Sequence, residues 1–143
     1  MNKYIPSPSK WVADQVELYE GSGGTKGSTY IGLPVIIVTN KGCKTDAIRK
    51  TPLMKVTDGD NYILIASMGG APENPVWYNN LKADSNVEIR DETQVYSMKA
   101  IEVIEPDERK RLWNIAIKTY PPYQEYQKKT DRVIPVFLAK SNY

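Results

Sequence analysis

Histidine is absent from this sequence of 143 residues, and cysteine and phenylalanine each occur only once. The absence of histidine excludes a Ser-His-Asp triad, an imidazole general base and a histidine-bearing zinc or iron site. The single cysteine, Cys43, excludes an intrachain disulfide, a CxxC redox pair and a cysteine-rich metal site. We therefore expect no metal centre. Lys44 could activate the adjacent Cys43 thiol as a nucleophile, but the favoured interpretation is a small loop or edge residue, because only lysine or aspartate could serve it as a base.

The sequence also lacks a long hydrophobic run. The N-terminal segment MNKYIPSPSK has no signal-like apolar core, and the longest apolar runs, such as residues 34–38, have the length of a strand. We expect a cytoplasmic protein without a transmembrane helix, and association with a membrane surface stays open.

Strong net charge is lacking as well. The 19 basic and 17 acidic residues leave a formal charge of +2, which gives no reason to expect a nucleic-acid partner. The basic residues are instead concentrated in one segment, which holds Lys41, Lys44, Arg49, Lys50 and Lys55 against the single acid Asp46. An anionic ligand is expected to bind at this segment.

Apolar periodicity and turn residues predict the elements of the fold. Helices are predicted from Ser7-Pro8-Ser9 to about residue 20, and over 75–83, 106–120 and 123–128, with Pro121-Pro122 interrupting the last two. Strands are predicted over 34–39, 52–57, 62–67, 87–90, 94–104 and 133–140, with a loop or tight connection over the basic residues 40–51. Hairpin turns are expected at 58–60 and near 91–92.

These elements predict an α+β fold with an antiparallel, barrel-like sheet of about six strands, because the helices are grouped and do not alternate with strands. Residues 1–143 are expected to form one domain, in which 1–27 is an N-terminal helix and a flexible connector. The connector sequence GSGGTKG has the wrong glycine order for a dinucleotide fingerprint, and no strand precedes it. A Rossmann fold is therefore rejected.

Two segments could bind an anionic, planar ligand. In Gly42–Met54 (GCKTDAIRKTPLM), cationic side chains and turn N–H groups suit a phosphate or carboxylate, although a basic loop is more often a solvated surface. In Ala66–Pro72 (ASMGGAP), the paired glycines allow close backbone approach and Ser67 places a hydroxyl at a strand end, although a plain tight turn explains the glycines equally well.

Two further segments are rich in aromatic side chains. Pro75–Leu81 (PVWYNNL) supplies aromatic faces and side-chain amides, although such aromatics more often belong to a core. In Tyr120–Tyr126 (YPPYQEY) a tyrosine recurs at every third residue, so the phenols could close a pocket or pack a terminal helix. Each segment is a weak signal when it is taken alone.

In this order, the four segments resemble the deazaflavin-dependent nitroreductase family of split-barrel proteins. The resemblance extends from about Trp11 to Leu138 and includes WVADQVELYEGSGG near the start and RVIPVFLAK near the end. It implies a split β-barrel and, as hydride donor, the reduced 8-hydroxy-5-deazaflavin coenzyme F-420, whose tail carries a phosphate and glutamates. The chain departs from the family at Asp46, where glycine is common, and at Met54 and Met68, where some relatives carry polar or aromatic residues.

The resemblance also implies roles for individual residues. The implied cofactor-binding residues are Cys43, Lys44, Thr45, Arg49, Lys50, Thr51, Pro52, Leu53, Met54, Ile65, Ala66, Ser67, Met68, Val76, Trp77, Tyr78, Asn79, Asn80 and Tyr123. The substrate side is implied to be Ser67, Trp77, Tyr120, Tyr123 and Tyr126, of which Ser67 and the three tyrosines are the expected catalytic residues. We expect Ser67, Tyr123 and Tyr126 to orient an electron-poor acceptor (a quinone, a nitroaromatic or an activated olefin) and to support its protonation after hydride arrival.

Other interpretations of the sequence stay open. One is an FMN-binding oxidoreductase on the same barrel, and another is a non-catalytic barrel that binds the coenzyme or an amphipathic lipid. A homodimer is compatible with the sequence, and so is peripheral membrane contact if the acceptor is a lipid quinone. A nucleic-acid binder would need a basic stripe, and only one loop qualifies.

Overall fold

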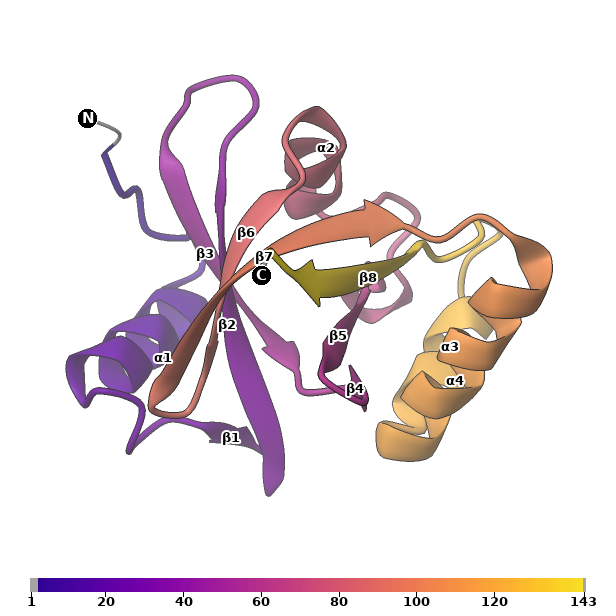
Figure 1. Ribbon diagram of the computed structural model, residues 1–143, viewed down its shortest axis with the longest axis horizontal. Coiled ribbons are helices and arrows are strands. Elements are labelled where there is room, and N and C mark those ends of the chain that lie inside the picture. Colours follow the sequence, from indigo (N-terminus) through magenta and orange to yellow (C-terminus); the bar gives the residue numbers. More distant parts are fainter. Residues whose placement is uncertain (1–2, 143) are drawn as a thin grey trace.

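The computed structural model describes residues 3–142, which form one curled antiparallel sheet flanked by helices (Figure 1). The strands are β1 (Thr29–Tyr30), β2 (Leu33–Lys41), β3 (Ile48–Met54), β4 (Thr57–Asp58), β5 (Asn61–Ile65), β6 (Asn86–Asp91), β7 (Gln94–Glu102) and β8 (Val136–Ser141). The helices are α1 (Lys10–Gly21), the 3-10 turn η1 (Met68–Gly70), α2 (Val76–Ala83), α3 (Pro106–Thr119) and α4 (Pro122–Lys128).

The strand order is β1-β2-β6-β7-β8-β5-β4, and β3 pairs with β2 outside this path. Every pairing between these strands is antiparallel. The expected α+β fold is therefore confirmed, although the sheet contains two additional strands of two residues each. Over residues 3–142, no helix combines the length and the apolar character that crossing a bilayer requires.

Strand β2 is buried on both faces, which explains its continuous run of β-branched residues. On one face, Ile36 and Val38 belong to a core that also contains Phe137. On the other face, Val35 and Ile37 pack against Val16 and Tyr19 of helix α1. Burial of α1 on this outer face places the N-terminal helix beside β3, where it can form one wall of a site (Figure 1).

A second core joins the C-terminal helices to β5 and β8. It contains Leu112 and Ala116 of α3, Tyr123 of α4, and Ile63 and Val136 of the two strands. The helical spacing of the apolar residues in α3 therefore buries one face of this helix. Pro121-Pro122 ends α3 and starts α4, so the chain turns sharply and keeps both helices on the same core.

The basic segment is shorter as a loop than the sequence predicts. Strands β2 and β3 pair from Val35↔Met54 to Lys41↔Ile48, so only residues 42–47 form the turn. That turn is closed by Gly42 N–H donating to Ala47 O over 2.7 Å, with Asp46 at a φ of 56°. The strand predicted over 52–57 therefore begins at Ile48 and ends at Met54, because pairing with β2 outweighs the polar character of residues 49–51.

The connector after α1 is joined by hydrogen bonds to itself and to the end of the helix. Ser22 Oγ accepts from Lys26 N–H over 2.9 Å, and Gly24 N–H donates to Tyr19 O over 2.9 Å. A Cβ atom added to Gly24 would lie 1.8 Å from Glu92 O, so the glycine serves close packing against the β6–β7 turn. Tyr19 fixes the same turn, because its hydroxyl accepts from Glu92 N–H over 2.7 Å.

Candidate functional site

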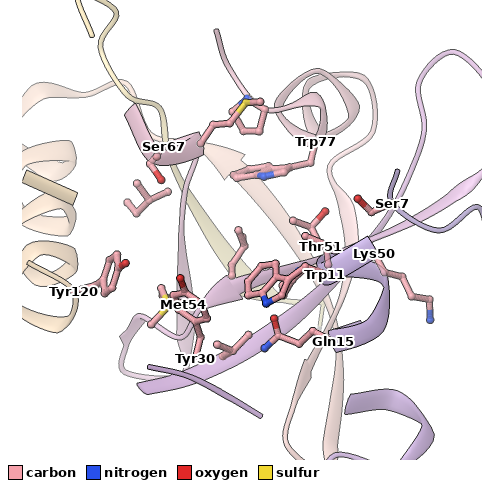
Figure 2. A pocket seen from close by; sticks show the side chains of 18 of the residues that line it. Ser7, Trp11, Gln15, Tyr30, Lys50, Thr51, Met54, Ser67, Trp77 and Tyr120 are labelled. Carbon is pink, nitrogen blue, oxygen red and sulfur yellow. The ribbon is translucent and has the colours of Figure 1, made fainter. Parts of the chain in front are cut away.

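A cavity of about 450 Å³ lies among α1, β3, the turn after β5, α2 and α4 (Figure 2). It is lined by Ser7, Trp11, Val12, Gln15, Tyr30, Val35, Lys50, Thr51, Pro52, Leu53, Met54, Ile65, Ser67, Met68, Gly69, Pro75, Val76, Trp77, Tyr120, Tyr123 and Tyr126. Aromatic and aliphatic side chains dominate this lining, and hydroxyl groups are its main polar component. A cavity of this size and composition suits a planar organic ligand.

Three tyrosines form one wall of the cavity. Tyr120 lies at the end of α3, and Tyr123 and Tyr126 lie in α4, so the proline break places all three on one side. Their rings pack edge to face or tilted, with centroids 4.9 Å apart for Tyr120 and Tyr123 and 6.2 Å apart for each of the other two pairs. The hydroxyl oxygens of Tyr120 and Tyr126 lie 3.1 Å apart, within hydrogen-bond distance.

The phenols of Tyr120 and Tyr123 stay protonated at neutral pH. Burial raises the pKa of Tyr120 to about 12, and the hydrogen bond with Tyr126 adds to this effect. Burial also raises the pKa of Tyr123, with smaller contributions from the neighbouring phenols. Within residues 3–142 the Tyr123 hydroxyl has no hydrogen-bond partner, although the side chain is only 4% exposed. Tyr123 therefore presents a neutral O–H donor that a ligand in the cavity can engage.

Ser67 lies at the entry to a strained turn, which packs against the helix that carries Tyr123 and Tyr126. The turn places Met68, Gly69 and Gly70 consecutively at positive φ, with values of 47°, 64° and 83°. Such a conformation is costly for methionine, and strain of this kind is often found at functional sites. In the part of the chain that the structure describes, the Ser67 hydroxyl also lacks a partner, and it points toward the cavity (Figure 2).

A second cavity of about 200 Å³ adjoins the first and is edged by cationic side chains. It is lined by Ile5, Ser7, Pro8, Arg49, Lys50, Thr51, Val76, Trp77 and Asn80. Several of these residues line both cavities, so the apolar chamber continues into a more polar one. Arg49 donates one guanidinium N–H to Ile5 O over 3.1 Å, which leaves its other donors available to an anion.

Lys50 lines both cavities, but its charge already has a partner. Its ammonium group lies 2.7 and 2.8 Å from the two carboxylate oxygens of Glu20 on α1. It also lies 5.4 Å from the centre of the Tyr4 ring. Lys50 is therefore neutralised by the protein itself, whereas the sequence analysis expected a free cation for a ligand. A carboxylate from 30 residues earlier in the chain cannot be anticipated without the tertiary fold.

Most of the predicted cofactor-binding residues line these two cavities. They are Arg49, Lys50, Thr51, Pro52, Leu53, Met54, Ile65, Ser67, Met68, Val76, Trp77, Asn80 and Tyr123. The predicted catalytic residues Ser67, Tyr120, Tyr123 and Tyr126 all line the larger cavity. The segments that carry them are far apart in the sequence, and the curled sheet brings them together.

Six predicted residues line neither cavity. Cys43, Lys44 and Thr45 are exposed in the 42–47 turn, because the β2–β3 pairing carries this turn beyond the cavities. The exposed Asn79 lies on the solvent side of α2, and the fully buried Ala66 belongs to the core. Tyr78 packs edge to face on Phe137, and its hydroxyl donates to Glu102 over 3.2 Å. The structure therefore does not bring Lys44 together with Arg49 and Lys50.

The N-terminal wall of the larger cavity was not predicted from the sequence. Trp11 and Tyr30 form an edge-to-face pair with ring centroids 5.3 Å apart, and Gln15 lies beside them in α1. Gln15 is oriented by its Nε2, which donates to Gly27 O over 3.3 Å. Trp11 is 57% exposed, and its place outside the buried stripe of α1 was the available signal.

A curled antiparallel sheet that places an aromatic, hydroxyl-lined chamber beside a basic one suits a planar ligand with an anionic tail. Residues 11–141 match the family described as F420H(2)-dependent quinone reductase, and the chain belongs to this family. The expected oxidoreductase class and the expected F-420 cofactor are thereby confirmed.

Individual relatives agree with this assignment. An F420H(2)-dependent quinone reductase from Mycobacterium tuberculosis is 37% identical over 125 residues, which cover 85% of this chain and 83% of that protein. The solved structure of an F420-H2 dependent reductase, FDR-A, is 42% identical with a TM-score of 0.70, covering 75% of this chain and 94% of that one. A chain solved as a domain-swapped dimer is 40% identical with a TM-score of 0.73, covering 94% of this chain and all of that one.

Distant structures support the fold alone. A protein of the pyridoxinephosphate oxidase family from Clostridium acetobutylicum is 13% identical, with a TM-score of 0.51 over 90% of this chain and 85% of that one. The expected split-barrel architecture is therefore confirmed.

Proposed function

We propose that this protein transfers a hydride from reduced F-420 to an electron-poor acceptor within the 450 Å³ cavity. The first acceptor class is a quinone, and nitroaromatics and activated olefins are further candidates. The observation that carries the proposal is the set of hydroxyls from Ser67, Tyr123 and the Tyr120–Tyr126 pair around one apolar chamber. A quinone that gains a hydride needs hydrogen-bond donors on its carbonyl oxygens, and these groups supply them.

The two cavities fit the two parts of the cofactor. We place the tricyclic ring in the larger cavity, against residues 51–54 of β3, Ile65, Met68 and the Trp77 ring. We place the tail with its phosphate and glutamates in the smaller cavity, where Arg49 offers a charged, planar donor group. A neutral lining would leave the charged tail without compensation, so a cation next to an apolar chamber is the expected arrangement.

When bound in its reduced state, F-420 supplies the hydride. Tyr123 and Ser67 donate hydrogen bonds to the acceptor oxygen that gains negative charge, and their neutral state lets them do so without a prior titration step. The Tyr120–Tyr126 pair borders the same chamber and can pass a proton to that oxygen. One hydride and one proton together convert the quinone to its hydroquinone.

Fluorescence titration with F-420 tests the placement of the tail. We expect Arg49→Ala to weaken binding about tenfold or more, with a larger effect at low salt, because a charge-assisted contact to the tail is lost. Lys99→Ala is the control, since Lys99 is an exposed lysine on β7 that lines neither cavity. Unchanged affinity in Arg49→Ala would show that the tail binds elsewhere.

We also propose a homodimer and contact with a membrane surface. The dimer is supported by the related chain that was solved as a domain-swapped dimer. Membrane contact is supported by Trp11, Met68 and Val76, which line the cavity while 57%, 56% and 69% exposed, so apolar groups surround its opening. Sedimentation equilibrium measures the oligomeric state, and co-sedimentation with phospholipid vesicles measures binding to a membrane surface. A monomer at micromolar concentration, or no vesicle binding, would contradict the respective proposal.

A further inference from the structure

Arg132 makes an unusual set of contacts outside the cavity lining. Its Nε donates to Ala71 O over 2.9 Å, and its Nη2 donates to Ser67 O over 2.8 Å. Its Nη1 donates both to Ala66 O over 3.1 Å and to Asn74 Oδ1 over 2.7 Å. The side chain therefore holds the segment from Ala66 to Asn74 at both ends with four hydrogen bonds.

All four acceptors are neutral oxygens, and within residues 3–142 no carboxylate pairs with Arg132. A half-buried guanidinium without a counter-ion is costly unless its donors are satisfied. The planar fork of N–H groups satisfies them here by reaching several backbone carbonyls at once. A lysine has no such fork, so this site requires the shape of arginine in addition to its charge.

The backbone of Arg132 is itself fixed to α4. Gln127 Nε2 donates to Arg132 O over 2.8 Å, and Gln127 Oε1 accepts from Ile134 N–H over 2.9 Å. The arginine consequently ties the segment 66–74 to the helix that carries Tyr123 and Tyr126.

The segment that Arg132 holds also borders the larger cavity, through Ser67, Met68 and Gly69. It contains Ser67 and the positive-φ turn, and it leads directly into α2 and Trp77. The turn also touches α4, since a Cβ atom on Gly70 would lie 2.6 Å from Tyr126 O. A strained turn persists only when its surroundings hold it, and the Arg132 hydrogen bonds supply that restraint.

We propose that Arg132 is a positioning residue for hydride transfer, which holds the Ser67 turn at a fixed distance from the tyrosine wall. In this arrangement Ser67 and Tyr123 line the same cavity. The assignment rests on the proposed function for its effect on rate. Its effect on the geometry of the turn is independent of that function.

The kinetic test uses Arg132→Ala and Arg132→Lys in the full chain. We expect the single-turnover rate with F-420 and menadione to fall at least tenfold in both variants, and by more than the affinity for F-420 falls, because the tail contacts on β3 are intact. Guanidinium chloride at tens of millimolar should recover part of the rate of Arg132→Ala, whereas sodium chloride at equal concentration should not. Rescue by free guanidinium would show that the cation occupies the space left by the Arg132 side chain. A variant that had generally lost its fold would not be rescued in this way.

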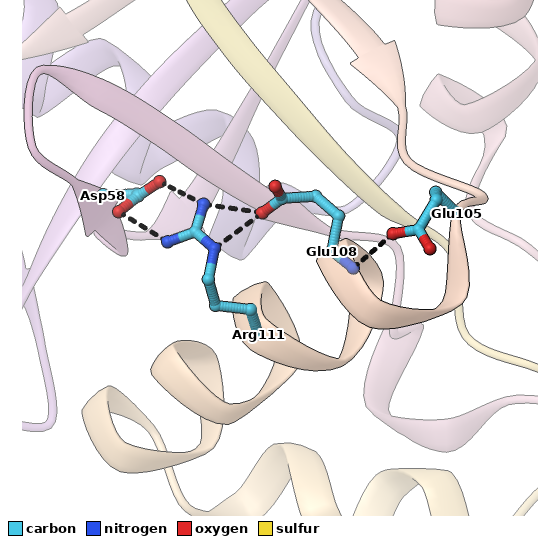
Figure 3. Close-up of polar contacts among 4 residues, drawn as sticks. All are labelled: Asp58, Glu105, Glu108 and Arg111. Carbon is cyan, nitrogen blue, oxygen red and sulfur yellow. Dashed lines mark hydrogen bonds and ion pairs between the residues drawn. The ribbon is translucent and has the colours of Figure 1, made fainter.

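Arg111 provides the matched control, because it also joins two elements through several contacts but lies away from the cavities. Its guanidinium donates to both carboxylate oxygens of Asp58, over 3.1 and 2.8 Å, and to Glu108 over 2.7 Å (Figure 3). Arg111→Ala should keep the wild-type rate and show no response to guanidinium. A similar loss and rescue in this variant would mean that guanidinium acts nonspecifically, and the proposal would be wrong.

A second readout needs neither cofactor nor turnover. In protein labelled with 5-fluorotryptophan, the ¹⁹F resonance of Trp77 should shift or broaden in Arg132→Lys, while that of Trp113 on α3 stays in place, and guanidinium should restore the Trp77 signal in Arg132→Ala. Wild-type resonances and wild-type rates in both variants would overturn the positioning role. If the wild type itself transfers no hydride, the proposed function fails, and the ¹⁹F result still decides whether Arg132 orders the turn.

Discussion

Replacing Tyr123 by phenylalanine separates catalysis from stability, because the structure assigns the hydroxyl no partner within residues 3–142. The substitution keeps the ring and its edge-to-face contact with Tyr120, whose centroid lies 4.9 Å away. It removes only an O–H group that has no hydrogen-bond partner in the protein and belongs to a residue lining the cavity. Because no hydrogen bond within the protein is lost, the free energy of unfolding should change by less than about 0.5 kcal/mol.

The rate of hydride transfer, unlike the stability, should fall in Tyr123→Phe. If Tyr123 donates to the acceptor oxygen in the transition state, loss of this donor should slow hydride transfer about 10²-fold, which corresponds to about 2.7 kcal/mol of activation free energy. Tyr120→Phe is the comparison, because it breaks the 3.1 Å contact with Tyr126 and should lower the free energy of unfolding by about 1 kcal/mol.

Two assays measure the pair of effects. Stopped-flow absorbance follows the oxidation of reduced F-420 by menadione in a single turnover, and urea denaturation gives the stability. A Tyr123→Phe protein with the wild-type single-turnover rate would refute the assigned role. A stability loss comparable to that of Tyr120→Phe would refute the structural premise that the Tyr123 hydroxyl lacks a partner.

Three further predictions follow from specific contacts. Glu20→Gln frees the Lys50 ammonium from its carboxylate partner and should tighten F-420 binding about threefold to tenfold. The fluorescence titration should also show a steeper dependence of this binding on salt. Weaker binding would mean that Glu20 instead positions Lys50. Gly70→Ala places a Cβ atom 2.6 Å from Tyr126 O at a φ of 83°, so it should lower the free energy of unfolding by about 3 kcal/mol. Gly69→Ala is the control, because its Cβ atom meets no atom within 4 Å, and it should cost about 1 kcal/mol. Equal urea midpoints for the two variants would contradict this prediction. Folding raises the pKa of Tyr120 from its ordinary value of 10.0 to about 12. The stability that this shift contributes is therefore complete below pH 10 and is lost as the pH rises toward 12. Urea midpoints measured across this range should fall less in Tyr120→Phe than in the wild type.

Local sequence signals predicted those elements whose apolar pattern or proline residues lie within a single segment of the chain. Pro121-Pro122 separates two helices as expected, and the β-branched run of β2 is a doubly buried strand. The β3 boundary was predicted wrongly, because Arg49-Lys50-Thr51 has the polarity of a loop. Its pairing with β2 is a tertiary effect that outweighs local propensity.

The site could be predicted only in part, because some of its contacts also depend on the tertiary fold. Ser67 and the tyrosine wall were identified because their motifs are compact in sequence and the family resemblance relates them to one another. The Glu20–Lys50 ion pair and the Arg132 contacts join residues 30 and about 60 positions apart, and no local pattern encodes such a distance. The aromatic wall from Trp11 and Tyr30 was missed because each residue alone reads as an ordinary surface position.

Direct binding followed by turnover is the measurement that addresses the central claim. Wild-type protein titrated with F-420 should bind one equivalent per chain, and the reduced complex should be oxidised when it is mixed with menadione. Saturable binding of FMN with no binding of F-420, or a tight F-420 complex that menadione does not oxidise, would contradict the claim that these cavities hold a deazaflavin for hydride transfer.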